Sequence, residues 1–204
     1  MKRVIKLGGS FLTCPDLESR LQKWQKSSAP AHTLAIVGGG GLVNAIRDMN
    51  AIASLDERTT HWRCVELLSH TFEIMAQRLN WQTIKRPEEL KQWIQAPTGK
   101  EEITLVKVDT FYRVSDSTAT SSGAGRWNLH GRDLLPENWN TTTDSIAAML
   151  ALVVQASELV ILKSCPITPE ATLQELAAAG IVDQAFPQIA EQVSSVRVEQ
   201  LVAA

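Results

Sequence analysis

Two glycine-rich segments early in the sequence have the composition of anion-binding loops. Lys6-Leu7-Gly8-Gly9-Ser10 ends one short apolar run, and Gly38-Gly39-Gly40-Gly41 follows a second. Glycine allows positive φ and lets backbone N–H groups approach an anion without an obstructing Cβ, while a following helix adds a favourable dipole. Both segments are therefore candidate phosphate-binding loops. The alternative for either one alone is an ordinary tight turn at a strand end.

Two charged residues lie where charge is costly without a partner. Lys6 lies in a strand that otherwise faces the core, so its ammonium must reach water or an anion at the strand end. Asp144 lies in Asn140-Thr141-Thr142-Thr143-Asp144-Ser145, before an apolar helix, where it could position lysine ammonium groups or a magnesium-bound nucleotide. The plainer alternatives are that Lys6 extends to solvent and that Asp144 caps the helix.

Other nucleotide, metal and nucleophile patterns are missing from the sequence. No GxGxxG follows the first apolar run and no GxxxxGK[ST] occurs, which disfavours Rossmann and P-loop proteins. His61 and His70 are too far apart for an HExxH-like pair, so no metal site built from protein ligands is predicted. His61 could contact a substrate; the alternative is that it lies on the wet face of a helix. Ser10 lacks the His and Asp pattern of a catalytic triad.

Alternating apolar runs and helical patterns predict the elements that position these residues. In such α/β proteins, ligands bind beyond the carboxyl ends of the strands, which is where both glycine segments fall. The predicted fold class is α/β, with a mostly parallel sheet covered by helices on both faces. Strands are predicted at 4–7, 33–37, 81–85, 103–108, 159–162 and 196–198, and helices from 17, from 42 and at 57–79, 87–94, 143–156 and 170–179.

The composition favours a small ligand over a macromolecular one. A chain of 204 residues has the length of one domain, and residues 1–204 are predicted to form one, with a flexible loop at 115–125. The net charge of -2 favours neither nucleic acid nor a membrane surface as partner. Three cysteines without CxxC pairing suit a reducing compartment, and the longest apolar run, 146–154, is far short of the roughly 20 residues of a membrane span. We expect a cytoplasmic location.

Taken together, three ordered segments resemble the signatures of the amino acid kinase family, which includes acetylglutamate, aspartate, carbamate, uridylate and isopentenyl phosphate kinases. The segments are residues 5–10, 36–40 and 142–148. The resemblance implies a three-layer α/β/α sandwich of the carbamate kinase type. It also implies transfer of the γ-phosphoryl group of ATP, with Mg²⁺, to a small anionic acceptor that ends in a carboxylate, carbamate or phosphate. A homodimer or larger homo-oligomer is expected.

The resemblance further implies a role for each residue of these segments. Lys6 would stabilise the transferring phosphoryl group, and Asp144 would orient the lysines of the site. Such a mechanism depends on positioning and charge neutralisation rather than on a covalent intermediate. The phosphates of ATP would bind to Gly8, Gly9 and Ser10, and the anionic end of the acceptor to Gly38, Gly39 and Gly40.

Within the family, the chain resembles the small kinases of methanofuran biosynthesis, which phosphorylate (aminomethyl)furan-methyl phosphate. The residues that carry this likeness are Ser54-Leu55-Asp56 before a helix with His61, the approach 135–139 to Thr142, and Gly180-Ile181-Val182-Asp183. Two alternatives stay open. One is a kinase of an amino acid carboxylate or of isopentenyl phosphate, and the other is a non-catalytic member that binds nucleotides or anions.

The chain departs from the family pattern after Leu162. Many members have Leu-Thr-Asp-Val-Asp-Gly-Val-Tyr where this chain has Leu162-Lys163-Ser164-Cys165-Pro166-Ile167, and a later Gly-Gly-Met segment with a second catalytic lysine is missing. Lys163 could supply the second positive charge, since it ends a strand at the same edge as Lys6; the alternative is a lysine that faces solvent. Catalysis therefore depends on what Lys163 contacts.

Overall fold

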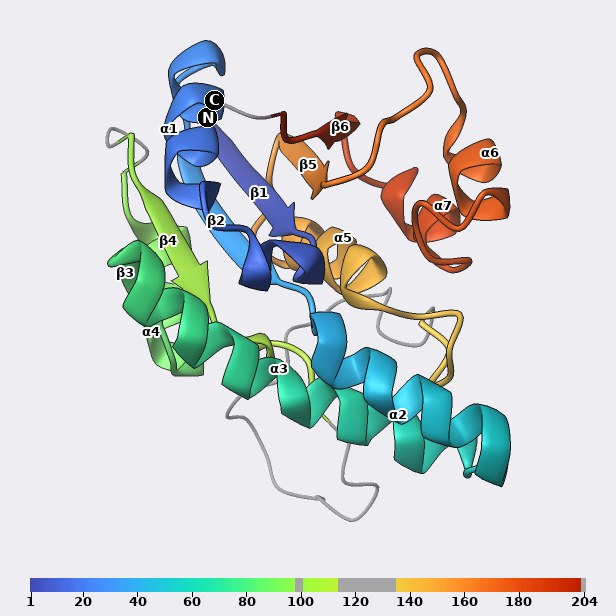
Figure 1. The fold of residues 1–204 in the computed structure, drawn as a ribbon. Helices are drawn as coiled ribbons and strands as arrows, with labels where there is room; N and C mark the ends of the chain where they lie inside the picture. Colours follow the sequence, from blue (N-terminus) through green and yellow to red (C-terminus); the bar gives the residue numbers. More distant parts are fainter. Residues whose placement is uncertain (98–100, 114–134, 203–204) are drawn as a thin grey trace.

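A six-stranded, all-parallel sheet forms the centre of the computed structural model, which describes residues 1–97, 101–113 and 135–202 (Figure 1). The strand order is β3-β4-β2-β1-β5-β6. β1 pairs with β2 on one side and with β5 on the other, so the order of connection reverses beside β1. The strands are β1 (Lys2–Leu7), β2 (His32–Val37), β3 (Gln82–Ile84), β4 (Ile103–Val106), β5 (Glu158–Lys163) and β6 (Val196–Gln200).

Helices cover both faces of the sheet and make a three-layer structure. The face that carries Val4 and Ile161 packs against α4 (Pro87–Gln95) and α5 (Thr143–Val153). α7 (Phe186–Ala190) packs on α5, and α6 (Leu173–Ala178) packs on α7. The face that carries Ile5 and Leu162 packs against α1 (Leu17–Ser27). Successive strand residues point to opposite faces, and these continuous apolar runs therefore supply both cores.

Two further helices, α2 (Gly40–Ala53) and α3 (Glu57–Leu79), pack together and extend beyond the carboxyl ends of the central strands (Figure 1). The side chain of Asp56 caps α3 by accepting a hydrogen bond from the Thr59 N–H. α3 contributes Leu68 to one core and Phe72 to the other. In contrast, α2 contributes no fully buried residue.

The predicted α/β class is confirmed, and the differences lie at the ends of elements and in short helices. The helix predicted from residue 170 begins at Leu173 because Glu170 takes φ +64° and Thr172 forms a capping box with Glu175. The helix predicted to end at 156 ends at Val153, since Gln155 takes φ +52°. Not predicted were α7 and two 3-10 helices, η1 (Gly9–Thr13) and η2 (Val108–Thr110).

Two further expectations concern the loop at 115–125 and a membrane span. The loop predicted at 115–125 lies outside the described residues. Within the described ranges, no helix combines the length and apolar character needed to cross a membrane.

Candidate functional site

A cleft of about 430 Å³ lies at the carboxyl ends of β1, β2 and β5, beside the point where the strand order reverses. This is the position at which parallel α/β sheets bind their ligands. Its lining includes eight residues predicted from the sequence: Lys6, Gly9, Ser10, Gly38, Gly39, Gly40, Asp144 and Lys163. It also includes residues that were not predicted, among them Asn44, Arg47, Trp139 and Asp183.

Lys6, Asp144 and Lys163 form a buried charge cluster in this cleft. Lys6 Nζ lies 2.9 Å from Asp144 Oδ1, and Lys163 Nζ donates a 2.8 Å hydrogen bond to Asp144 Oδ2. The side chains of Lys6, Asp144 and Lys163 are 6%, 4% and 13% exposed. One carboxylate therefore faces two ammonium groups, which leaves one excess positive charge in the cluster. Neither lysine extends freely into solvent.

Sheet register and helix capping bring these three side chains together. Lys6 pairs with Ile161 across the two strands, and Lys163 lies two residues beyond Ile161, so both lysines point to the α5 face. Asp144 lies in the first turn of α5, whose N-cap is Thr142 rather than Asp144. Because the cap is supplied by Thr142, the Asp144 carboxylate is free to face the lysines.

Burial and neighbouring charge set the protonation of the cluster. Burial raises the pKa of Asp144, but the charges of Lys6 and Lys163 outweigh this effect and hold the pKa below its usual value. The pKa of Lys163 is lowered by burial and by the positive charge of Lys6, although Asp144 opposes both. The carboxylate is therefore ionised at neutral pH, and it favours the charged form of Lys163.

Asp183, for which the sequence suggested no chemical role, fixes the start of α5. Its Oδ2 accepts hydrogen bonds from the N–H and hydroxyl of Thr142, both at 2.8 Å, and from the Ser145 N–H at 3.0 Å. Its Oδ1 accepts a hydrogen bond from the Ser145 hydroxyl. Burial and the charge of Asp144 raise the pKa of Asp183, while these hydrogen bonds oppose the rise. Through Thr142 and Ser145, Asp183 positions the turn that carries Asp144.

The two glycine-rich segments lie against each other, which explains part of their composition. A Cβ on Gly9 would lie 2.1 Å from the Gly40 nitrogen, and one on Gly38 would lie 2.9 Å from the Gly9 nitrogen. Gly8 does not line the cleft, and its N–H donates a hydrogen bond to the Leu162 carbonyl at 3.1 Å, so this N–H is not free for a phosphate. The close approach of the two backbones therefore requires glycine at these positions, whether or not they also bind an anion.

Gly40 and Gly41 offer a matched pair of substitutions at this contact. Gly40 has φ +55°, and a Cβ there would lie 2.5 Å from the Gly9 carbonyl oxygen, whereas a Cβ on Gly41 would meet nothing within 4 Å. Gly40→Ala is expected to lower the free energy of unfolding by about 2 kcal/mol and to disturb the cleft. Gly41→Ala should change it by no more than about 0.5 kcal/mol. Urea unfolding of both variants checks this; equal effects would contradict the packing described.

The N-terminal half of α2 supplies further polar groups to the cleft. Its first N–H groups have no partner within the helix and carry the positive end of the helix dipole. Arg47 and Asn44 line the cleft, and the Arg47 guanidinium carbon lies 5.0 Å from the ring centroid of Trp139. The Ser10 hydroxyl, which also lines the cleft, lies 2.8 Å from the Ser164 hydroxyl. Sequence reasoning missed Arg47 because a lone arginine on a surface helix carries no distinguishing pattern.

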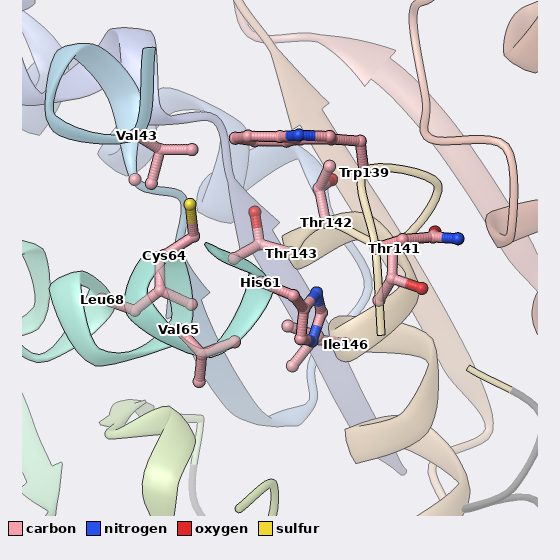
Figure 2. A pocket seen from close by; sticks show the side chains of 12 residues that line it. Val43, His61, Cys64, Val65, Leu68, Trp139, Thr141, Thr142, Thr143 and Ile146 are labelled. Carbon is pink, nitrogen blue, oxygen red and sulfur yellow. The ribbon is translucent and has the colours of Figure 1, made fainter. Parts of the chain in front are cut away.

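His61 lies in a smaller side pocket next to the cleft rather than in the cleft itself (Figure 2). It is 6% exposed, so it does not belong to the wet face of α3. Its Nε2 lies 2.9 Å from the Tyr112 hydroxyl, and burial lowers its pKa. The imidazole is therefore neutral at pH 7.

The described residues offer no cage for a metal ion. Among them, no group of three or more His, Cys, Asp or Glu side chains is placed to hold one. Both oxygens of Asp144 are engaged by lysines, and both oxygens of Asp183 accept hydrogen bonds. Neither carboxylate therefore has an oxygen that is free of a protein partner to bind a metal ion directly.

Fold and site define a three-layer α/β protein with a lysine-lined cleft at the switch point of a parallel sheet. The chain belongs to the amino acid kinase family, whose family model matches residues 1–166. A search of curated protein sequences gave no match.

Solved structures of kinases share this fold. Uridylate kinase from Archaeoglobus fulgidus is 14% identical, with a TM-score of 0.55 over 98% of this chain and 92% of that one. UMP kinase from Ureaplasma parvum is 14% identical, with a TM-score of 0.58 over 100% of this chain and 91% of that one. Aspartate kinase from Synechocystis is 14% identical, with a TM-score of 0.57 over 98% of this chain but only 38% of that one. These neighbours show the fold, and membership of the family supports a phosphotransferase in general.

Proposed function

We propose that the protein is an ATP-dependent kinase that transfers the γ-phosphoryl group to a small anionic acceptor. The observation that carries the proposal is the cluster of Lys6, Asp144 and Lys163, in which one buried carboxylate holds two ammonium groups at the edge of a cleft. Phosphoryl transfer spreads negative charge over the transferring group, so fixed positive charge beside it lowers the barrier.

Each member of the cluster has a distinct part in this reaction. Lys6 and Lys163 neutralise charge on the transferring phosphoryl group from two neighbouring strands. Asp144 accepts no proton; it holds both ammonium groups in place and opposes the lowering of the Lys163 pKa by burial. Lys163 thus takes the place of the second lysine that other family members supply from a later segment.

ATP would bind along the β5 side of the cleft. A second cleft of about 460 Å³ is lined by the segment after β5 and by α6, including Pro166, Pro169 and Leu176, and Ile181 lines both clefts. The base and ribose would bind in the second cleft, and the phosphates would reach Gly9, Ser10 and Lys163. Mg²⁺ would come with the phosphates and supply charge neutralisation.

The acceptor would bind on the α2 side. Its anionic end would contact the N-terminus of α2 at Gly39 and Gly40, with Arg47 as a second positive group. This arrangement suits a phosphate or a carboxylate. Among phosphates, the sequence likeness to the methanofuran kinases favours a furan-methyl phosphate, and isopentenyl phosphate or an amino acid carboxylate is the alternative.

The oligomeric state stays a prediction. Leu42, Met49 and Ile52 on α2 are 42%, 59% and 89% exposed, which supports a contact between copies there. Light scattering from the purified chain would measure its mass in solution, and a monomer at micromolar concentration would contradict the prediction.

An acceptor panel tests the proposal and separates it from a non-catalytic binding role. Thermal unfolding with and without MgATP would show binding, and release of ADP would be measured with a furan-methyl phosphate, isopentenyl phosphate, aspartate, glutamate and carbamate. We expect a higher melting temperature with MgATP and acceptor-dependent ADP release with at least one compound. Stabilisation by MgATP without turnover on the whole panel would favour the binding protein.

A further inference from the structure

The buried carboxylate of Asp183 joins the first turn of α5 to the C-terminal part of the chain. Asp183 is 8% exposed, and its two oxygens accept four hydrogen bonds, two from Thr142 and two from Ser145. Thr142 lies two residues before Asp144, and Ser145 directly follows it. The backbone that carries Asp144 is therefore held on both sides by one carboxylate.

The segment that carries Asp183 is itself firmly anchored. Val182 and Phe186 are 3% and 0% exposed, and both belong to the core on the α5 side of the sheet. The Ala185 N–H donates a 2.9 Å hydrogen bond to the Asn140 carbonyl, shortly before α5. A shift of the Asp183 carboxylate away from α5 would therefore require buried contacts to change.

Asp183 also acts on the charge cluster through space. Its negative charge opposes the lowering of the Lys163 pKa by burial, as the charge of Asp144 does. Two of the groups that face Asp183 Oδ2 are backbone N–H groups, which can only donate, so they favour the ionised carboxylate. A second negative charge close to the two lysines lowers the cost of burying both ammonium groups.

We propose that Asp183 is a positioning residue of the phosphoryl-transfer centre. It holds Asp144 in place, and Asp144 in turn aligns the two lysines of the cluster. Asp183 lines the cleft, but protein donors engage both of its oxygens, so it acts through Asp144 rather than on the substrate. Its effect on the rate rests on the proposed function. Asp183 lies beyond residues 1–166, which the family model matches, so the C-terminal part of this chain completes the site.

Asp183→Asn tests this role because it keeps the shape of the side chain, removes the charge and turns one acceptor into a donor. We expect kcat to fall by about 10²-fold while the KM for MgATP changes little. Each variant is assayed well below its melting temperature, measured by circular dichroism. A carboxylate that only stabilised α5 would lower the melting temperature and leave the kcat of the folded protein unchanged, which would overturn the inference.

An exposed carboxylate provides the matched control for this substitution. Glu191 lies at the end of α7, in the same C-terminal part of the chain, and its side chain accepts a hydrogen bond from Gln174. Glu191→Gln should leave kcat and the KM for MgATP as in the wild-type protein.

Ser145→Ala provides a milder variant in case Asp183→Asn does not fold. Ser145 is 0% exposed and does not line the cleft, and its hydroxyl donates to Asp183. The substitution keeps the charge of Asp183 and its other hydrogen bonds, so we expect kcat to fall by about fivefold. If Asp183→Asn does not fold, wild-type kcat in the folded Ser145→Ala protein would overturn the inference.

Acetylation of Lys163 provides a measurement that needs no turnover. Acetic anhydride reacts with the neutral amine, and loss of the Asp183 charge favours that form of Lys163. In Asp183→Asn, acetylation of Lys163 should be faster by about fivefold relative to the exposed Lys26, as read by peptide mass spectrometry. The same ratio as in the wild-type protein would overturn the inference.

The outcomes separate this inference from the proposed function. If the wild-type protein transfers no phosphoryl group to any acceptor but Asp183→Asn speeds acetylation of Lys163, the proposed function fails and Asp183 still positions the cluster. If transfer is observed and the folded Asp183→Asn protein keeps the wild-type kcat, the proposed function stands and the inference fails.

Discussion

Replacing Lys6 by methionine is expected to lower kcat by on the order of 10³-fold, because the variant keeps the length of the side chain and removes the charge beside the transferring phosphoryl group. The ammonium is 6% exposed and 2.9 Å from Asp144, so water cannot easily replace it. Asp144 keeps its hydrogen bond from Lys163, and we therefore expect the variant to fold. Steady-state kinetics with saturating MgATP and acceptor measures the effect.

A lysine far from the cleft provides the control for this change. Lys26→Ala, on the exposed side of α1, should leave kcat and KM unchanged. Circular dichroism of both variants would show whether the fold is kept. If the Lys6→Met protein is folded and turns over at the wild-type rate, the charge cluster is not the catalytic centre.

Asp144→Asn is expected to destabilise the protein by about 3 kcal/mol at pH 7 and to abolish most activity. The substitution leaves two buried ammonium groups without their counter-charge, and removal of one partner from a buried ion pair carries a cost of this size. The pKa of Lys163 is already lowered by burial and by Lys6, so loss of Asp144 would favour its neutral form. Urea unfolding measures the stability, and Asp48→Asn on the surface of α2 is the matched control.

The stability difference between wild type and Asp144→Asn should depend on pH in a defined direction. The folded-state pKa of Asp144 lies below its ordinary value, so its contribution is fully present above about pH 4. As the pH falls through the folded-state pKa, wild-type Asp144 also becomes protonated and the difference shrinks. Unfolding measured at pH 7, 5 and 3.5 follows this change. A difference that grew toward low pH would contradict an ionised Asp144.

The sequence was sufficient to predict the sheet because the central strands are continuous apolar runs. Residues 4–7, 33–37 and 159–162 are buried on both faces, and such short apolar runs are typical of parallel strands that are covered by helices on both sides. The five residues of α7 are too few to show a helical period, so that helix could not be predicted. The start of α6 depends on the positive φ of Glu170, for which a non-glycine residue gives no warning.

The charged residues of the cluster were predictable because they interrupt apolar segments, whereas the residue that positions Asp144 was not. A lysine inside an apolar strand and an aspartate at the start of an apolar helix each stand out against their neighbours. Asp183 binds Thr142 and Ser145 from 41 and 38 residues away, and sequence alone gives no such contact. The side pocket similarly depends on how Trp139 lies over α3, which no local pattern specifies.

The most direct test of the central claim is ³¹P nuclear magnetic resonance of the purified protein with MgATP and the best acceptor of the panel. We predict that the γ-phosphate signal of ATP decreases while signals of ADP and a newly phosphorylated acceptor rise in equal amounts. The Lys6→Met protein should show transfer slower by on the order of 10³-fold. If the wild-type protein binds MgATP and acceptor but no phosphoryl group moves to the acceptor, the protein is not the kinase proposed.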